Sequence, residues 1–193
     1  TDPSGNLVVA IIDVMGKGVS AALLASIFRT TFEMSLHIPT ASAILETINR
    51  TLCRQLGDLT MFITCAVARV SSDGRMLSHS SAGHCPTLFY QNTGARHLLT
   101  PSGPPLGIMA DTIYQEENHA LHGGERLILT TDGCYEWDRQ NNSSGWDNFV
   151  TRMDEERALP ANLLWQGIRG RISAAGHADL EDDCTLITID ILP

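Results

Sequence analysis

Three carboxylates stand where predicted strands meet loops. Asp132 lies between an apolar run and a glycine, Asp13 directly ends the apolar run 7–12, and Asp182 comes just before the strand-like residues 185–191. A fold can bring such loop positions together from distant parts of a chain. Carboxylate oxygens are the ligands that Mg²⁺ and Mn²⁺ prefer. The sequence therefore predicts a divalent metal site built from these three segments.

Each carboxylate also has a plainer interpretation. An Asp before a Gly, as at Asp132, is most often a turn residue, because its side chain hydrogen-bonds the local backbone. Asp182 and Asp183 follow Glu181 and could form a solvated acidic run. Adjacent carboxylates repel one another unless a cation is near, however. Three such positions in ordered motifs therefore favour metal ligation.

The glycines after Asp13 invite comparison with two nucleotide-binding motifs. Gly16, Gly18 and Ala21 satisfy the loose fingerprint G-x-G-x-x-A, in which a pyrophosphate rests on a helix N-terminus. That fold needs a parallel strand after the helix and an acidic residue about 20 positions further on, whereas a second helix is predicted here. A P-loop fails because the residue after Lys17 is a glycine rather than Ser or Thr. Dinucleotide binding stays open as the weaker alternative.

Composition limits the classes of protein to consider. The chain has 193 residues, of which 43% are hydrophobic, and a net charge of −9. Its length suits one domain, and its charge argues against nonspecific nucleic-acid binding. No stretch approaches the roughly 20 apolar residues of a membrane span, and no signal-peptide pattern is present. We expect a single domain, residues 1–193, that binds neither nucleic acid nor a membrane.

The cysteines and two histidines are further candidate sites. The five cysteines are widely spaced, and Cys65 and Cys184 lie in apolar runs, which predicts buried free thiols and a reducing cytoplasm. His119 and His122 could share a zinc ion, but two surface histidines are the favoured interpretation.

Hydrophobic periodicity predicts the elements that must position these residues. Residues 7–12 are typical of a strand covered on both faces, and helical spacing predicts helices over 20–34 and from Pro39 to about residue 56. Alternation and turn residues predict strands at 61–70, 76–81, 87–90, 113–120, 127–130 and 185–191, a polar loop at 138–145, and helices at 146–153 and 161–173. Strands and helices that do not alternate indicate an α+β layered fold.

Taken in order, the motifs resemble those of a known family. The segments are Asp13-Val14-Met15-Gly16-Lys17-Gly18, Ala82-Gly83-His84, the loop 103–107, Thr131-Asp132-Gly133 with Glu136, and Asp182-Asp183-Cys184-Thr185. They are similar to bacterial metal-dependent serine/threonine phosphatases of the PPM superfamily, in the branch of the sporulation stage II E protein and the stress-response phosphatases. The resemblance covers nearly the whole chain. It implies an α-β-β-α sandwich of two antiparallel sheets flanked by helices.

The resemblance also implies a role for each carboxylate. Asp13 would bridge two Mn²⁺ or Mg²⁺ ions, the carbonyl of Val14 would help to hold one of them, and Asp132 and Asp182 would hold the other. Asp13, Asp132 and Asp182 are thus the expected catalytic residues, with Asp183 a neighbour. Two divalent ions about 4 Å apart can lower the pKa of a bound water so that hydroxide attacks phosphorus in line.

The function implied is that of a phosphatase output domain in a bacterial signalling protein. Its regulatory domain would lie upstream, and its substrate would be a phosphorylated regulatory protein such as an anti-sigma-factor antagonist. The family's further acidic ligand belongs to a Gly-Gly-Asp segment on the preceding strand. Because the chain starts at Thr1, we expect an N-terminally truncated domain.

Several choices stay open in the sequence. The chief alternative function is a catalytically silent, phosphatase-like adaptor that binds protein. Lys17 could position a phosphate and His84 could donate a proton, although a solvent-exposed lysine and a structural histidine are the favoured interpretations. The residues serve Mn²⁺ and Mg²⁺ equally, and a homodimer is compatible with the sequence.

Overall fold

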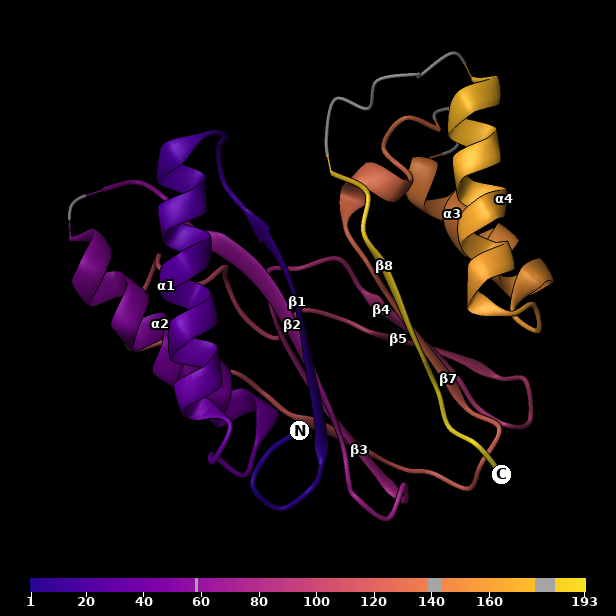
Figure 1. Cartoon of the computed structure of the whole chain (residues 1–193), viewed down its shortest axis with the longest axis horizontal. Coiled ribbons are helices and arrows are strands. Elements are labelled where there is room, and N and C mark those ends of the chain that lie inside the picture. Colours follow the sequence, from indigo (N-terminus) through magenta and orange to yellow (C-terminus); the bar gives the residue numbers. More distant parts are fainter. Residues whose placement is uncertain (58, 139–143, 176–182) are drawn as a thin grey trace.

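The chain folds into two antiparallel sheets that pack face to face, with a pair of helices on the outer side of each (Figure 1). The structure, a computed structural model, describes residues 1–57, 59–138, 144–175 and 183–193. The predicted α-β-β-α sandwich is confirmed. No helix in these ranges is both long enough and apolar enough to cross a membrane.

The first sheet has the strand order β1-β2-β3-β6. Its strands are β1 (Leu7–Val14), β2 (Ile63–Val70), β3 (Met76–Ala82) and β6 (Glu117–Ala120), each antiparallel to its neighbours. Two helices, α1 (Val19–Ser35) and α2 (Ala41–Leu56), cover its outer face. The Thr40 side chain accepts a hydrogen bond from the Ala43 N–H at 3.3 Å and so begins α2. Both helices lie within a few residues of their predicted ranges.

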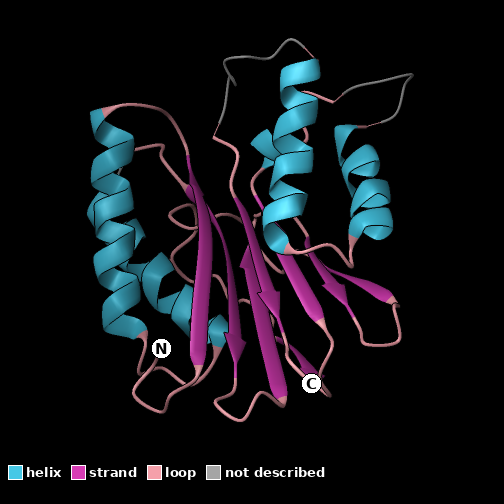
Figure 2. Cartoon of the chain, turned by 45° about the vertical axis from the view of Figure 1, so that its right-hand side comes forward, coloured by secondary structure: helices cyan, strands magenta, loops and turns pink. Residues whose placement is uncertain are grey.

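The second sheet has the order β5-β4-β7-β8. Its elements are β4 (Thr87–Tyr90), β5 (Arg96–Leu99), β7 (Arg126–Thr130), β8 (Leu186–Asp190), the short 3₁₀ turn η1 (Asp132–Cys134) after β7, and the covering helices α3 (Gly145–Glu156) and α4 (Ala161–Ala174). Figure 2 shows these two helices on the side of the sandwich away from α1 and α2. Each sheet is therefore a separate layer with its own helices.

The side chains between the two sheets form a continuous apolar layer. Ile11 from β1 and Leu77 from β3 pack there with Phe89, Leu127 and Ile189 of the second sheet. Leu127 has no exposed surface. Since no strand of the described ranges belongs to both sheets, this layer sets how the sheets lie against one another.

Three expectations about the strands need correction. Both faces of β1 are covered as predicted, but only Ile11 is buried, because β1 is an edge strand. The strand predicted at 113–120 begins only at Glu117, and β5 was not predicted.

The polar loop expected at 138–145 falls mostly on residues outside the described ranges, and its last residue, Gly145, already starts α3. The antiparallel pairing of β1 with β2 rules out a dinucleotide-binding βαβ unit.

The cysteine expectation is partly wrong. Cys184 is not a free thiol, because it forms a disulfide with Cys134 across 50 residues of sequence. Cys184 precedes β8 rather than lying within it, so its side chain reaches the turn after β7. Cys65 is a buried free thiol as predicted, and Cys53 and Cys85 are also free.

The two histidines considered for zinc lie in different environments. His122 is exposed as expected, whereas His119 is half-buried, with its ring centroid 5.0 Å from that of Phe89. The surface interpretation is thus wrong for His119. Its position on β6 places the ring against the interlayer core.

Candidate metal centre

A cleft of about 590 Å³ lies where β1 ends and β8 begins. From the first sheet it is lined by Asp13 and Val14, and from the segments that follow β7 and precede β8 by Thr131, Asp183 and Thr185. These segments meet because β1 and β7 both end, and β8 starts, at the same end of the sandwich (Figure 1). The fold therefore brings together residues that lie more than a hundred positions apart in the sequence.

The β1 side of the cleft consists of Asp13, the glycine loop and the start of α1. Asp13 pairs with Thr64 near the end of the ladder between β1 and β2, and the Met15 N–H donates to the Phe62 carbonyl at 3.0 Å. Gly16 and Gly18 then take φ values of 91° and 81°, which favour glycine. The small side chains Ala21, Ala22 and Ala25 of α1 line the cleft beside this loop. Lys17 is exposed there, as predicted.

The β7–β8 side holds Asp132 at the start of η1. The main-chain oxygen of Asp132 accepts hydrogen bonds from the N–H groups of Tyr135 and Glu136, both at 2.9 Å. Its Oδ1 is buried and meets no hydrogen-bond donor in the part of the chain that the structure describes. A buried carboxylate oxygen is costly without a donor or a cation. This atom fits a metal ligand.

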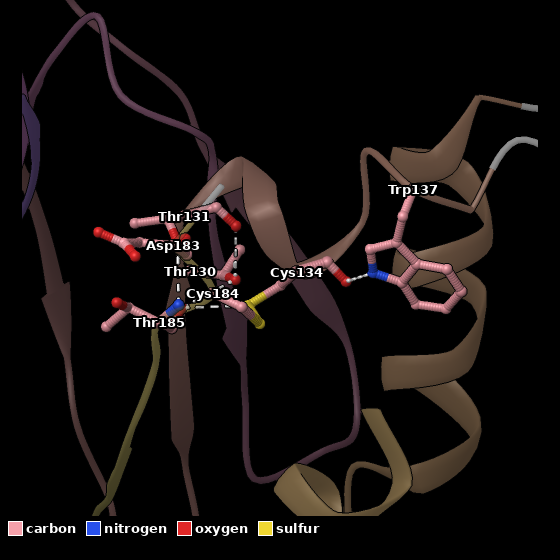
Figure 3. Close-up of a disulfide and its surroundings, with 7 residues drawn as sticks. All are labelled: Thr130, Thr131, Cys134, Trp137, Asp183, Cys184 and Thr185. Carbon is pink, nitrogen blue, oxygen red and sulfur yellow. Dashed lines mark hydrogen bonds between the residues drawn. A yellow bond between two sulfur atoms is a disulfide. The ribbon is translucent and has the colours of Figure 1, made fainter. Parts of the chain in front are cut away.

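Thr131 connects the two segments of this side (Figure 3). Its hydroxyl donates to the Asp183 carbonyl at 2.7 Å and accepts from the Thr185 N–H at 2.9 Å. Its own N–H donates to the Thr185 carbonyl at 3.1 Å. Thr131 is not among the predicted site residues, and its only sequence signal is its place next to Asp132 in front of a glycine.

The predicted ligands are placed unequally by the structure. Asp13 and Val14 line the cleft, and Asp132 follows the cleft residue Thr131. Asp182 lies outside the described ranges, while Asp183, expected to be a neighbour, lines the cleft itself. Among the described residues no three His, Cys, Asp or Glu side chains are gathered closely enough to hold a metal ion unaided. The oxygen donors that are present nevertheless suit a hard divalent cation.

Asp2, the acidic residue nearest the start of the chain, takes no part in this site. It is buried beyond the other end of β1, where it pairs with Arg69 and accepts hydrogen bonds from Ser4 and Asn6. These hydrogen bonds, that from the Asn6 side chain above all, lower the pKa of the Asp2 carboxyl. Asp2 thus attaches the residues before β1 to Arg69 of the neighbouring strand β2.

His84 lies between the two sheets close to the cleft residues. It is 3% exposed, and its Nδ1 is 2.8 Å from the hydroxyl of Thr64, the residue opposite Asp13. Burial lowers the pKa of His84 to about 4, and the main chain of Thr130 offsets this only in part. The imidazole is therefore neutral at neutral pH, which agrees with the structural role favoured by the sequence.

Comparison with known families decides the relationship of this chain. The family model of Stage II sporulation protein E (SpoIIE) matches residues 3–192. This chain belongs to the SpoIIE family. It is 30% identical over 186 residues to the phosphoserine phosphatase RsbU of Bacillus subtilis (strain 168), covering 94% of this chain and 54% of RsbU. It is 27% identical over 141 residues to RsbP, another phosphoserine phosphatase of that strain, covering 67% of this chain and 35% of RsbP. The chain thus spans about half the length of these relatives, or less.

Solved structures place the SpoIIE-family chain in the PP2C-like fold. The RsbU and RsbW domains of a Mycobacterium tuberculosis protein align with a TM-score of 0.80 at 22% identity, over 98% of this chain and 54% of that one. The SiaA-PP2C domain of Pseudomonas aeruginosa gives 0.80 at 17%, over 97% and 80%. The catalytic domain of the phosphatase PstP, solved in complex with 2 manganese ions, gives 0.69 at 13%, over 98% and 92%. The same fold thus holds a pair of metal ions in PstP.

Proposed function

We propose that this chain is a metal-dependent protein phosphatase domain that hydrolyses phosphoserine or phosphothreonine on a regulatory protein. The observation that carries the proposal is the cleft in which Asp13 from one sheet meets the Asp132 segment from the other, with a buried carboxylate oxygen left without a donor. Its similarity to two phosphoserine phosphatases supports the reaction. Residues 1–193 would form a single domain.

The proposed centre contains two Mn²⁺ or Mg²⁺ ions. Asp13 would bridge them, the Val14 carbonyl would contribute to one, and Asp132 and Asp182 would hold the other. When bound, such ions activate a water molecule as the nucleophile and neutralise phosphate oxygens. The edge position of these ligands, at the mouth of the sandwich, leaves the reacting phosphate accessible to a whole phosphoprotein.

Other residues of the cleft would bind and orient the substrate. Lys17 lines the cleft beside Asp13, where an ammonium group attracts the charge of a phosphate. The small side chains of Ala21, Ala22 and Ala25 leave room beside the loop for a phosphoserine stem. Thr131 would hold the main chain of Asp183 in place through its hydroxyl. These roles require no covalent intermediate on the protein.

We further propose a place for the domain in signalling. The substrate would be a phosphorylated regulator such as an anti-sigma-factor antagonist, and an upstream regulatory domain would control the site. Three of the five cysteines are free thiols, which supports a cytoplasmic location. The remaining two, Cys134 and Cys184, form the disulfide.

The deciding experiment measures Mn²⁺-dependent phosphate release from a phosphoserine protein by the full-length protein. The wild type is compared with Asp132→Asn and with a control variant, Asp190→Asn. Asp190 is a carboxylate at the opposite end of β8, where it pairs with Arg126. We expect turnover that needs Mn²⁺, disappears in Asp132→Asn and persists in the control. Equal turnover by Asp132→Asn and the wild type would refute the proposed centre.

A catalytically silent adaptor is the second candidate. It is favoured by one observation, that the described ranges gather no three ligating side chains. Titration with Mn²⁺ in a calorimeter separates the two functions. If the full-length protein shows no Mn²⁺ binding and no turnover, the adaptor function is the one that stands. Its target would then be captured with immobilised protein.

A further inference from the structure

The disulfide joins the two segments that form the β7–β8 side of the cleft. Cys134 ends η1, two residues after Asp132, and Cys184 directly follows Asp183. In Figure 3 the Asp183 carboxylate points away from the sulfur atoms, on the opposite side of the segment. The cross-link thus lies behind the cleft rather than in it. It fixes the main chain that carries the carboxylates without occupying their space.

The same two segments are also held without the disulfide. The hydroxyl and main chain of Thr131 make three hydrogen bonds to Asp183 and Thr185, at 2.7 to 3.1 Å. Within the first segment, the Trp137 indole N–H donates to the Cys134 carbonyl at 3.1 Å. Opening the disulfide therefore leaves the segments paired but less constrained.

A reduced Cys134 already has a partner in this arrangement. Its Sγ lies 3.3 Å from the Thr185 carbonyl oxygen, which can accept a hydrogen bond from a thiol. Cys134 itself is 2% exposed, whereas Cys184 is half-buried. Exchange with a small molecule consequently starts at the sulfur of Cys184, the accessible member.

We propose that Cys134 and Cys184 are a reversible dithiol–disulfide pair, and that closing it with a small disulfide oxidant such as oxidised glutathione tightens divalent cation binding in the cleft. The proposal rests on the proposed metal centre. The physical reason is preorganisation: the cross-link removes conformational freedom that the open segments must lose when their carboxylates converge on a cation. Because Thr131 already restricts these segments, the gain is on the order of tenfold in affinity rather than all-or-none.

The redox step balances with the oxidant named. The Cys184 thiolate attacks one sulfur of oxidised glutathione and releases one glutathione, which leaves a mixed disulfide. The Cys134 thiolate then attacks the Cys184 sulfur, forms the protein disulfide and releases the second glutathione. The two cysteine thiols are oxidised, one glutathione disulfide is reduced to two thiols, and the two protons from the cysteines pass to the glutathiones. Reduction by excess glutathione runs the same steps backwards.

The test compares one protein in two redox states. The full-length protein is equilibrated with oxidised or with reduced glutathione and freed of it by gel filtration. Peptide mass spectrometry then establishes the Cys134–Cys184 link, and calorimetry measures the Mn²⁺ dissociation constant. Cys184→Ser removes the pair, and Cys53→Ala, at a free cysteine of α2, is the matched control. Circular dichroism confirms that each form is folded.

We expect the oxidised wild type to bind Mn²⁺ about tenfold more tightly than the reduced form and to melt several degrees higher. Cys184→Ser should match the reduced wild type under both conditions, and Cys53→Ala should keep the full difference. Equal Mn²⁺ affinity in both states of the wild type, or no Cys134–Cys184 link after oxidation, would overturn the redox inference alone. Absence of Mn²⁺ binding in both states would overturn the metal centre and this inference with it.

Discussion

The two sides of the cleft are built on different principles. The β1 side is an edge strand followed by an exposed loop, in which a Cβ added at Gly16 or Gly18 would have no atom of the described ranges within 4 Å. The β7–β8 side is a turn fixed by Thr131, by a disulfide and by neighbouring buried residues. Few packed neighbours mean a low local free energy of opening. The comparison indicates that one side supplies a fixed reference for the cation while the other can adjust to a substrate or a regulator.

Replacing the carboxylates one side at a time should give the largest effects. We expect Asp13→Asn to lower Mn²⁺-dependent phosphate release by more than about 100-fold, because loss of a residue that only hydrogen-bonds a metal ligand already costs about 10–100-fold. Asp183→Asn should stay within about tenfold, since its neighbour Asp182 is the proposed ligand. Steady-state phosphate release at saturating Mn²⁺ measures both. A loss at Asp183 as large as at Asp13 would show that the roles of the two adjacent carboxylates are reversed.

Truncating one interlayer side chain on each side compares their packing. Leu127 on the inner strand β7 is completely buried, so Leu127→Ala should lower the free energy of unfolding by about 3–5 kcal/mol. Ile11→Ala, in the edge strand β1, should cost about 2–3 kcal/mol, because an edge strand can relax around the lost volume. Urea unfolding followed by fluorescence gives both values. The reverse ranking would contradict the assignment of the stiffer side.

The buried imidazole between the two sides predicts a pH dependence. The pKa of His84 is lowered from about 6.5 to about 4 by burial, so the unfolded chain binds more protons between these values. Stability should thus be full above about pH 6.5, fall as the pH approaches 4, and level off below, a loss of up to about 3 kcal/mol. His84→Gln should flatten the slope of unfolding free energy against pH. Burial also lowers the pKa of His79 to about 4, so His79 would account for the pH dependence that remains in this variant. An unchanged slope in His84→Gln would show that His84 does not cause the pH dependence.

The glycine loop should show the smallest change. Gly16→Ala introduces a side chain at φ 91° with no atom of the described residues within 4 Å, so its cost is backbone strain of about 1 kcal/mol. Gly74→Ala, in the hairpin turn between β2 and β3, is a matched control with φ 68° and similar open space. Both should lower the melting temperature alike. Only Gly16→Ala should raise KM for the phosphoprotein. Equal KM values for Gly16→Ala and Gly74→Ala would show that the glycine loop takes no part in substrate binding.

Periodicity predicted most of the fold because most of its elements have a covered face. The range 87–90 for β4 is matched residue for residue, and α1 and α2 differ from prediction by one or two positions. β5 gave no signal because it buries only Leu99, so no alternation marks it. The strand near residue 113 was shortened for the opposite reason: Ile113 is apolar yet exposed. Apolar sequence alone does not decide pairing.

The site was predictable only as far as local motifs reach. The strand-end position singled out Asp13 and Asp132, whereas Val14 was expected only from the family resemblance. In the structure Asp13 and Val14 line the cleft, and Asp132 follows the cleft residue Thr131. The pairing of Cys134 with Cys184 had no sequence signal, since it depends on two loops that meet only after both sheets have formed. The roles assigned to Asp13, Val14, Asp132 and Asp182 stay predictions. Asp182 itself lies outside the described ranges.

The apolar layer between the sheets has a consequence for the spacing of the ligands. Asp13 is carried by one sheet and Asp132 by the other, and in the described part of the chain side chains such as Ile11, Phe89 and Leu127 fill the space between the two layers. The thickness of that layer therefore acts as a gauge for the distance between the carboxylates. A bulkier or smaller interlayer residue, far from any ligand, would widen or narrow the gap and so shift the preference between cations of different radius.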